Sequence, residues 1–386
     1  MSEITHVEEL KGEDCTVTPL IKERNKKIDI IKGLAILLMV FGHAIFGSVG
    51  AGYDYLYEWI YLFHMPVFFM ASGFFWKDTS VKNLKQLLVF IWKKTKSLYI
   101  PYVFLNLFFL FFDDVLVALN LCETGINPLD LSVGNIIKIL LLYKGSVGFA
   151  GATWFLRALY IVLVAQGIWV FILNKIKAPK FISFIPFFGV VLFLLIIAFI
   201  QKDIPDVLFQ ILPAYIYFVF GILIKNVKKL TNLNVIYAVI LSIISTGLLV
   251  AIVFLRRRNA IISDILDVGI NGILGWIMLY SISVLIEKYS KIITRILCYL
   301  EKTTIYIVLW HFIAFKPVSL VYILIKRLPI EKLKDLPVIQ GTSSVLLAFS
   351  YTLVSVAICL LIRIIYVFFI NKIKELFRKN KHNKSL

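Results

Sequence analysis

Apolar residues run through the chain in long stretches that short polar clusters interrupt. Most stretches approach the ~20 residues that an α-helix needs to cross the hydrocarbon core of a bilayer. The pattern predicts spans at residues 28–49, 57–76, 98–112, 154–173, 181–200, 208–224, 235–255, 266–286, 304–325 and 342–362. We therefore expect an all-α, polytopic membrane protein with about ten transmembrane helices.

Composition and charge agree with this class of protein. Of the 386 residues, 60% are hydrophobic, and the mean hydropathy of +0.89 lies above the usual range of water-soluble domains. The net charge of +18 comes from Lys and Arg that cluster between the apolar stretches and at both ends. The positive-inside rule assigns most of these clusters, and both termini, to the cytoplasm. No basic groove with stacking aromatic residues stands apart from this pattern, so the charge does not indicate nucleic-acid binding.

The same pattern divides the chain into three regions. We expect residues 1–27 to be a polar cytoplasmic leader, residues 28–370 a membrane domain and residues 371–386 a basic cytoplasmic tail. The leader lacks the features of a cleavable signal peptide, so we predict a multi-pass protein of the cell membrane. No disulfide or metal spacing links the four cysteines, Cys15, Cys122, Cys298 and Cys359.

Two basic clusters do not fit the predicted orientation. The segments 256–258 and 326–327 are basic, yet a ten-span count places both outside. Either these cations bind an anionic glycan or lipid head group, which we favour, or one span is miscounted. The longest connection, residues 113–151, is also predicted to be external, either as a binding loop or as a plain solvated connection.

The first apolar stretch, Asp29–His43, carries a cation near its start and an imidazole deep inside it. Lys32 and His43 are eleven residues apart, so on a helix both side chains project from one face, about 16 Å apart along the axis. Ionisable groups within a bilayer usually mark a functional pathway. The alternative is structural: His43 hydrogen-bonds to a neighbouring helix, and Lys32 extends its ammonium to the membrane surface.

Other polar side chains also fall in or beside apolar stretches. They are His64, His311, Arg157 and Lys316. A cavity lined by cations and imidazoles suits a polyanionic substrate or a developing oxyanion, although each residue alone is more often structural. The spacing matches no single-helix zinc motif and no carboxylate cluster accompanies it, so we expect no metal. Pro66, close to His64, is expected to kink or break the second span.

Six segments, taken together, resemble a known family. They are Asp29–His43, Phe63–Phe74, Lys93–Tyr102, Thr153–Tyr160, Tyr217–Gly221 and Ile305–His311. In their residues and their order they resemble the acyltransferase-3 family of membrane acyltransferases. The resemblance covers nearly all of the chain from residue 24 onward.

The resemblance implies a ten-helix enzyme that moves an acyl group, usually acetyl, from cytoplasmic acyl-CoA to a hydroxyl of a cell-surface glycan or its lipid-linked precursor. Lys32 and His43 match the family's basic-x10-His pair, and Lys93 and Lys94 match the basic loop between its second and third spans. Acetyl-CoA or another acyl-CoA would be a substrate, and no permanently bound cofactor is implied. The expected partners are acyl-CoA, the glycan or lipid-linked sugar, the lipid bilayer and glycan-assembly proteins.

The chain departs from the family in three ways. Lys32 stands where arginine is commoner, which reduces a bidentate phosphate contact to a point charge. A glutamate-bearing motif of many polysaccharide-modifying members is absent, and Trp154–Tyr160 stands in its expected place. No extracytoplasmic domain follows the last span, so we expect final transfer in the membrane domain or on a separate partner.

We expect Lys32, Lys93 and Lys94 to attract the CoA phosphates and neutral His43 to act as general base on the acceptor hydroxyl. Lys32 and His43 are the predicted catalytic pair, and Arg157 or His64 would stabilise the oxyanion. The predicted substrate- and donor-binding residues are His64, Lys93, Lys94, Trp154, Arg157 and His311. A covalent acyl-histidine stays open, as do a transporter of a polysaccharide or small molecule and a structural subunit of a glycan-assembly complex.

Overall fold

The structure is a computed structural model of the whole chain. It describes residues 25–48, 52–123, 131–143, 145, 148–200, 205–227, 233–258, 269–342 and 344–383. In these ranges all regular secondary structure is helical, as the apolar pattern predicts. The leader, including Cys15, falls almost entirely outside them.

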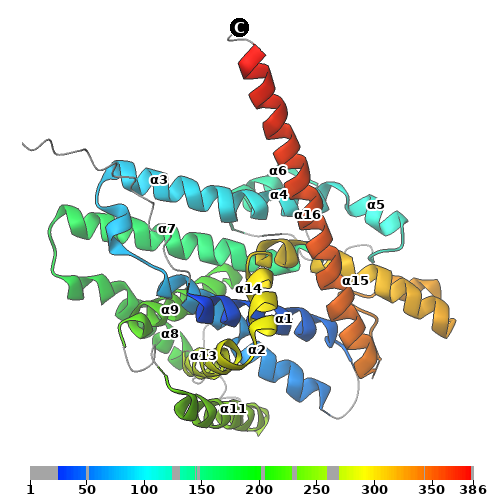
Figure 1. Ribbon diagram of the computed structural model, residues 1–386, viewed down its shortest axis with the longest axis horizontal. Coiled ribbons are helices and arrows are strands. Elements are labelled where there is room, and N and C mark those ends of the chain that lie inside the picture. The colour runs from blue at the N-terminus through cyan, green and yellow to red at the C-terminus, as the bar shows by residue number, and fades with distance from the viewer. Residues whose placement is uncertain are drawn as a thin grey trace, which may run out of the picture.

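Figure 1 shows the arrangement of the described helices. In chain order they are α1 (Lys26–Ala44), α2 (Tyr53–Phe74), η1 (Asp78–Val81), α3 (Leu84–Lys94), η2 (Thr95–Tyr99), α4 (Ile100–Phe111), α5 (Asp113–Ala118), α6 (Val133–Leu140), η3 (Gly148–Thr153), α7 (Trp154–Lys175), η4 (Lys180–Phe184), α8 (Ile185–Ile200), α9 (Asp206–Lys225), α11 (Val235–Arg258), α13 (Ile270–Tyr289), α14 (Lys291–Glu301), α15 (Thr304–Lys326), η5 (Ile330–Lys334) and α16 (Val345–Asn383).

Among the described residues, six helices are long and apolar enough to cross a membrane, fewer than the ten predicted. They are α7, α9, α11, α13, α15 and α16, at six of the predicted positions. The apolar pattern therefore located these six spans correctly.

The other four predicted spans fail on charge, polarity or length. Helix α1 includes Lys27, Asp29 and Lys32, and α2 includes Glu58 and His64 among its apolar residues. Helix α4 continues from α3 through η2, and its apolar part has only 12 residues, whereas α8 has 16. A run of apolar residues did not distinguish these helices from the six candidates, because length and polarity have to be met together.

Helix α1 lies in the middle of the other helices (Figure 1) and packs against α2, α13, α14, α15 and α16. The side chain of Asn25 caps its start by accepting a hydrogen bond from the backbone N–H of Ile28. The helix ends at Ala44, five residues before the predicted end at residue 49. His43 therefore lies in the last turn of α1, and Lys32 lies in its first half.

Helix α2 is continuous through Pro66, so the predicted break does not occur. Close backbone contacts hold it in place. A Cβ atom built on Gly73 would lie 1.8 Å from the carbonyl oxygen of Phe218 in α9, and one built on Gly221 would lie 2.0 Å from that of Met70. Glycine at both positions lets α2 and α9 approach until their backbones touch.

The basic cluster at the end of α11 contacts the start of α2. Arg257 donates to the carboxylate of Glu58 over 2.8 Å, and its guanidinium carbon lies 4.1 Å from the centre of the Tyr55 ring. Arg257 thus has a partner within the chain. The predicted binding of a glycan or lipid head group at this cluster stays a prediction.

Because α2 and α9 are in close contact, we expect one added methyl group there to lower the stability of the protein. Gly221→Ala should lower the melting temperature of the protein in detergent, because overpacking at a tight contact costs about 1–3 kcal/mol. Gly189→Ala in α8 is the matched control, since a Cβ atom there meets no atom within 4 Å. It should be neutral or slightly stabilising, because alanine favours helix more than glycine does. An unchanged melting temperature for Gly221→Ala would contradict the backbone contact.

Candidate functional site

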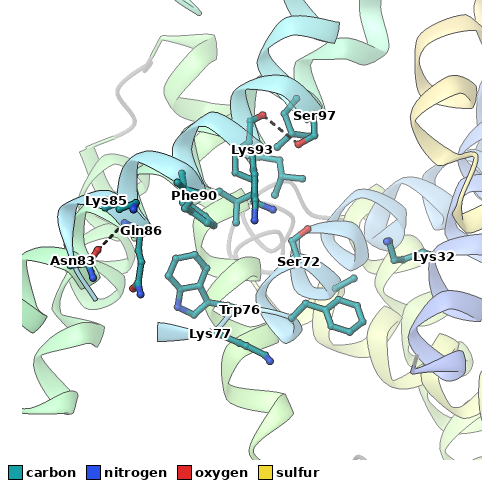
Figure 2. Close-up of a pocket in the computed structure, with 17 residues that line it drawn as sticks. Lys32, Ser72, Trp76, Lys77, Asn83, Lys85, Gln86, Phe90, Lys93 and Ser97 are labelled. Carbon is teal, nitrogen blue, oxygen red and sulfur yellow. Dashed lines mark hydrogen bonds between the residues drawn. The ribbon is translucent and has the colours of Figure 1, made fainter. Parts of the chain in front are cut away.

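Two cavities lie along the helices α1, α2 and α7. The larger, here called the basic cavity, has a volume of about 920 Å³ (Figure 2). Its wall includes five lysines and, among the described residues, no carboxylate: Lys32, Lys77, Lys85, Lys93 and Lys94. Such a wall attracts a polyanion.

The lysines reach the basic cavity from two sides. Lys32 comes from α1, whereas the other four come from the segment that joins α2 to α3 and from α3 itself. Figure 2 shows Lys32 across the cavity from Asn83 and Lys85. Burial lowers the pKa of Lys94, because loss of water disfavours its charged ammonium. An anion bound in the cavity would favour that charge again.

The predicted phosphate-binding residues Lys32, Lys93 and Lys94 therefore line one cavity, although 61 residues separate Lys32 from Lys93 in the sequence. Lys32 also has a protein partner. Its Nζ atom lies 2.5 Å from Oε1 of Glu301, the last residue of α14. Sequence reasoning did not identify Glu301, because nothing in its surroundings indicates that α14 packs on α1.

The smaller cavity, here called the histidine cavity, has a volume of about 230 Å³. Its described lining residues include no Lys, Arg, Asp or Glu. They are Met39, His43, Tyr61, His64, Met65, Pro66, Phe68, Ala152, Trp154, Phe155 and Val308. The walls are thus largely apolar and aromatic, with imidazole, hydroxyl and indole groups as the polar side-chain parts.

His43 is held by a side chain that sequence reasoning missed. Its Nδ1 atom lies 2.8 Å from the hydroxyl of Tyr61, one turn before His64 on the same face of α2. The spacing of three residues between Tyr61 and His64 was a usable signal, since it places both on one helix face. With Nδ1 engaged by the hydroxyl, Nε2 is the ring nitrogen of His43 that is left for a substrate.

His64 and His311 are each held by the backbone of their own helix. Nδ1 of His64 lies 2.8 Å from the carbonyl oxygen of Ile60, and Nδ1 of His311 lies 2.7 Å from that of Ile307. A carbonyl oxygen only accepts, so both Nδ1 atoms carry the proton. In the neutral ring Nε2 then has a lone pair and no proton. Neutral His64 is therefore suited to accept a proton and not to donate to an oxyanion.

The other two predicted histidines, His64 and His311, lie near His43. The rings of His43 and His311 have centroids 5.2 Å apart, and the ring of Tyr61 lies 4.8 Å from that of His64. His311 is fully buried beside His43, but it does not line the histidine cavity. Its Nε2 atom has no hydrogen-bond partner among the residues that the structure describes.

Arg157 and Lys316 lie elsewhere. Buried Arg157 donates to the backbone carbonyl of Tyr143 and to Oε1 of Gln210 in α9, and it lines neither cavity. Its predicted contact with an oxyanion stays a prediction. Lys316 donates to the carbonyl oxygens of Leu333 and Asp335, which holds η5 and the segment after it against α15.

The two cavities follow each other along shared helices. On α2, Phe68 lines the histidine cavity and Ala71 lines the basic cavity. On α7, Phe155 lines the histidine cavity and Leu159 lines the basic cavity. Offsets of three and four residues correspond to about one helical turn, or roughly 5.4 Å. The ring of Phe69 packs against that of Phe155 at this boundary, with centroids 5.0 Å apart.

Comparison with known proteins gives one match. A family described as an acyltransferase domain matches residues 25–364, which include both cavities. No curated protein and no solved structure matched the chain. Among the described residues, no group of three His, Cys, Asp or Glu side chains is placed to hold a metal ion.

Proposed function

The chain belongs to the acyltransferase-3 family, and from this premise we propose that it is a membrane O-acyltransferase for a glycan. The acyl group, acetyl in the simplest case, would come from cytoplasmic acyl-CoA. The acceptor would be a hydroxyl of a cell-surface glycan or of its lipid-linked precursor. Family membership shows an enzyme that transfers acyl groups; donor, acceptor and residue roles are what we add.

The observation that carries the proposal is the pair of cavities. CoA joins a phosphate-bearing nucleotide to a long uncharged arm that ends in the thioester. The five lysines of the basic cavity suit the phosphates. The histidine cavity, about one helical turn away, suits the uncharged thioester end because no charged side chain lines its described wall.

In the proposed reaction, Nε2 of neutral His43 accepts the proton of the acceptor hydroxyl. The hydroxyl oxygen then attacks the thioester carbonyl carbon, and a tetrahedral oxyanion forms. When this collapses, the carbon–sulfur bond breaks and the thiolate of CoA takes the proton from His43. The products are the O-acyl ester and free CoA, and His43 is again neutral.

Tyr61 orients the base in this reaction. For Nε2 to have a free lone pair, Nδ1 of His43 must carry a proton and donate it to the hydroxyl oxygen of Tyr61. The hydroxyl of Tyr61 is also hydrogen-bonded to that of Tyr57, so its proton already has a partner. The indole N–H of Trp154 is a side-chain donor of the described cavity wall that suits an oxyanion.

The uncharged wall also bears on the acceptor. A carboxylate or phosphate on the reacting sugar would be buried without a charged partner among the described lining residues, at a high cost in free energy. The proposal therefore favours an uncharged sugar ring, with Trp154 as an apolar surface for it. Charged parts of a longer glycan would have to stay outside the histidine cavity.

The first prediction from the proposed function concerns the general base, His43. His43→Ala should reduce acyl-CoA-dependent acylation by roughly 10²- to 10⁴-fold, the contribution of a positioned general base. Release of free CoA by purified protein in nanodiscs is the measurement, with candidate glycans present. His382→Ala, near the end of α16, is the control and should behave as wild type.

Two outcomes would contradict different parts of the proposal. Wild-type CoA release by His43→Ala at equal abundance would exclude His43 as the base. A well-folded wild type that releases no CoA, with or without glycans, would exclude acyl transfer from CoA and favour a transporter.

The second prediction concerns Tyr61. Tyr61→Phe keeps the ring but removes the hydroxyl that binds Nδ1, so kcat should fall by about tenfold or more, a part of the contribution of the base. The KM for acyl-CoA should change little. Tyr237→Phe, an exposed tyrosine of α11, is the matched control. Equal kcat values for Tyr61→Phe and wild type would show that the hydroxyl does not orient His43.

The third prediction concerns the basic cavity. Lys93→Ala and Lys94→Ala should each raise the KM for acyl-CoA up to roughly fivefold, since a partly exposed charge pair contributes about 0.2–1 kcal/mol. The effect should shrink at high salt, because salt screens the attraction. Lys291→Ala, an exposed lysine at the start of α14, should leave KM unchanged. A salt-independent KM would argue against phosphate binding by these lysines.

A further inference from the structure

Lys32 differs from the other lysines of the basic cavity. Of the five, it alone is in an ion pair with a carboxylate in the part of the chain that the structure describes. That carboxylate belongs to Glu301, 269 residues further along. Lys32 lines the cavity, whereas Glu301 is not among the residues that line it.

The backbone fixes where Glu301 lies. A Cβ atom built on Gly33 would be 2.4 Å from the carbonyl oxygen of Leu297, so α1 and α14 touch at the residue that follows Lys32. Leu297 is one helical turn before Glu301, and it is buried, as is Leu300. The carboxylate is thus held beside Lys32 by a main-chain contact and two buried side chains.

Lys32 lines the basic cavity while it is paired with Glu301. The side chain of Lys32 is 25% exposed and that of Glu301 is 12% exposed, so the carboxylate is the more buried partner. An ammonium has three N–H donors, and Oε1 of Glu301 accepts one of them in this pair. A lysine side chain alone is flexible and loses rotamer freedom when it binds a phosphate. A lysine already held in place loses less.

We propose that Glu301 is a positioning residue that holds the ammonium of Lys32 at the edge of the basic cavity, ready for a phosphate of the acyl-CoA donor. The inference rests on the proposed function, because it assigns Glu301 a role in donor binding. The carboxylate also repels the phosphate. The other four lysines of the cavity offset this repulsion, and Lys32 lines the cavity whereas Glu301 does not.

The test compares the KM for acyl-CoA and kcat in a graded series. Glu301→Ala should raise KM roughly three- to tenfold, the size of coupling seen between contacting residues, with kcat little changed. Glu301→Gln should raise KM less, since its amide oxygen still accepts from the ammonium. Glu58→Gln is the matched control, because it breaks a comparable ion pair with Arg257 that lies outside the cavity. It should not change KM.

A double variant separates positioning from packing. Glu301→Ala in a Lys32→Ala background should add nothing to the KM of Lys32→Ala alone, because Glu301 acts through Lys32. Additive increases, or equal losses in KM and kcat together with a lower melting temperature, would overturn the proposal in favour of a packing role. A lower KM in Glu301→Ala would overturn it as well, since Glu301 would then compete with the phosphate.

The two levels of the proposal fail in different ways. If the wild type releases no CoA from acyl-CoA, the proposed function fails and Glu301 has no donor to serve. If the wild type is active and Glu301→Ala keeps the wild-type KM, the proposed function stands and only the role of Glu301 is wrong.

Discussion

Polar groups buried between apolar helices must find partners within the protein, and this constraint determines which of them can react. His64 and His311 satisfy Nδ1 with carbonyl oxygens of their own helices, and Lys316 satisfies its ammonium with two carbonyls of a connecting segment. Each of these partners is a backbone atom that cannot change its protonation. His43 differs, because its partner is the hydroxyl of Tyr61 and its ring lines a cavity.

Close approach of the helices places these groups. Helix α1 touches α14 at Gly33, and α2 touches α9 at Gly73 and Gly221, in each case with no room for a further carbon atom. Side chains on such helices have little freedom to separate. The short contacts therefore set both the separation of the two cavities along α2 and the position of Glu301 beside Lys32. Packing of glycines far from the proposed reacting atoms thus becomes a condition for the proposed chemistry.

Sequence reasoning reached the parts of the site that lie on one helix or in one motif. The eleven-residue spacing of Lys32 and His43 indicated a shared face, and the structure places them at two cavities on the same helix. Six of the ten predicted spans coincide with helices long and apolar enough to cross a membrane; charge in α1, polarity in α2 and the short apolar parts of α4 and α8 account for the rest. Glu301 and Gln210 were out of reach, since contacts across α14 and α9 depend on tertiary packing that local patterns do not encode.

The separation of charge between the cavities shapes the proposed chemistry. Proton transfer from a hydroxyl to His43 creates an imidazolium and an oxyanion inside a largely apolar cavity, where separated charges are costly. The centroid of the His43 ring lies 5.2 Å from that of the His311 ring. Nε2 of His311 has no hydrogen-bond partner among the described residues. Lysines lining the histidine cavity would destabilise that imidazolium by like-charge repulsion. Keeping the lysines in the basic cavity therefore separates the proposed phosphate binding from the proposed proton transfer at His43.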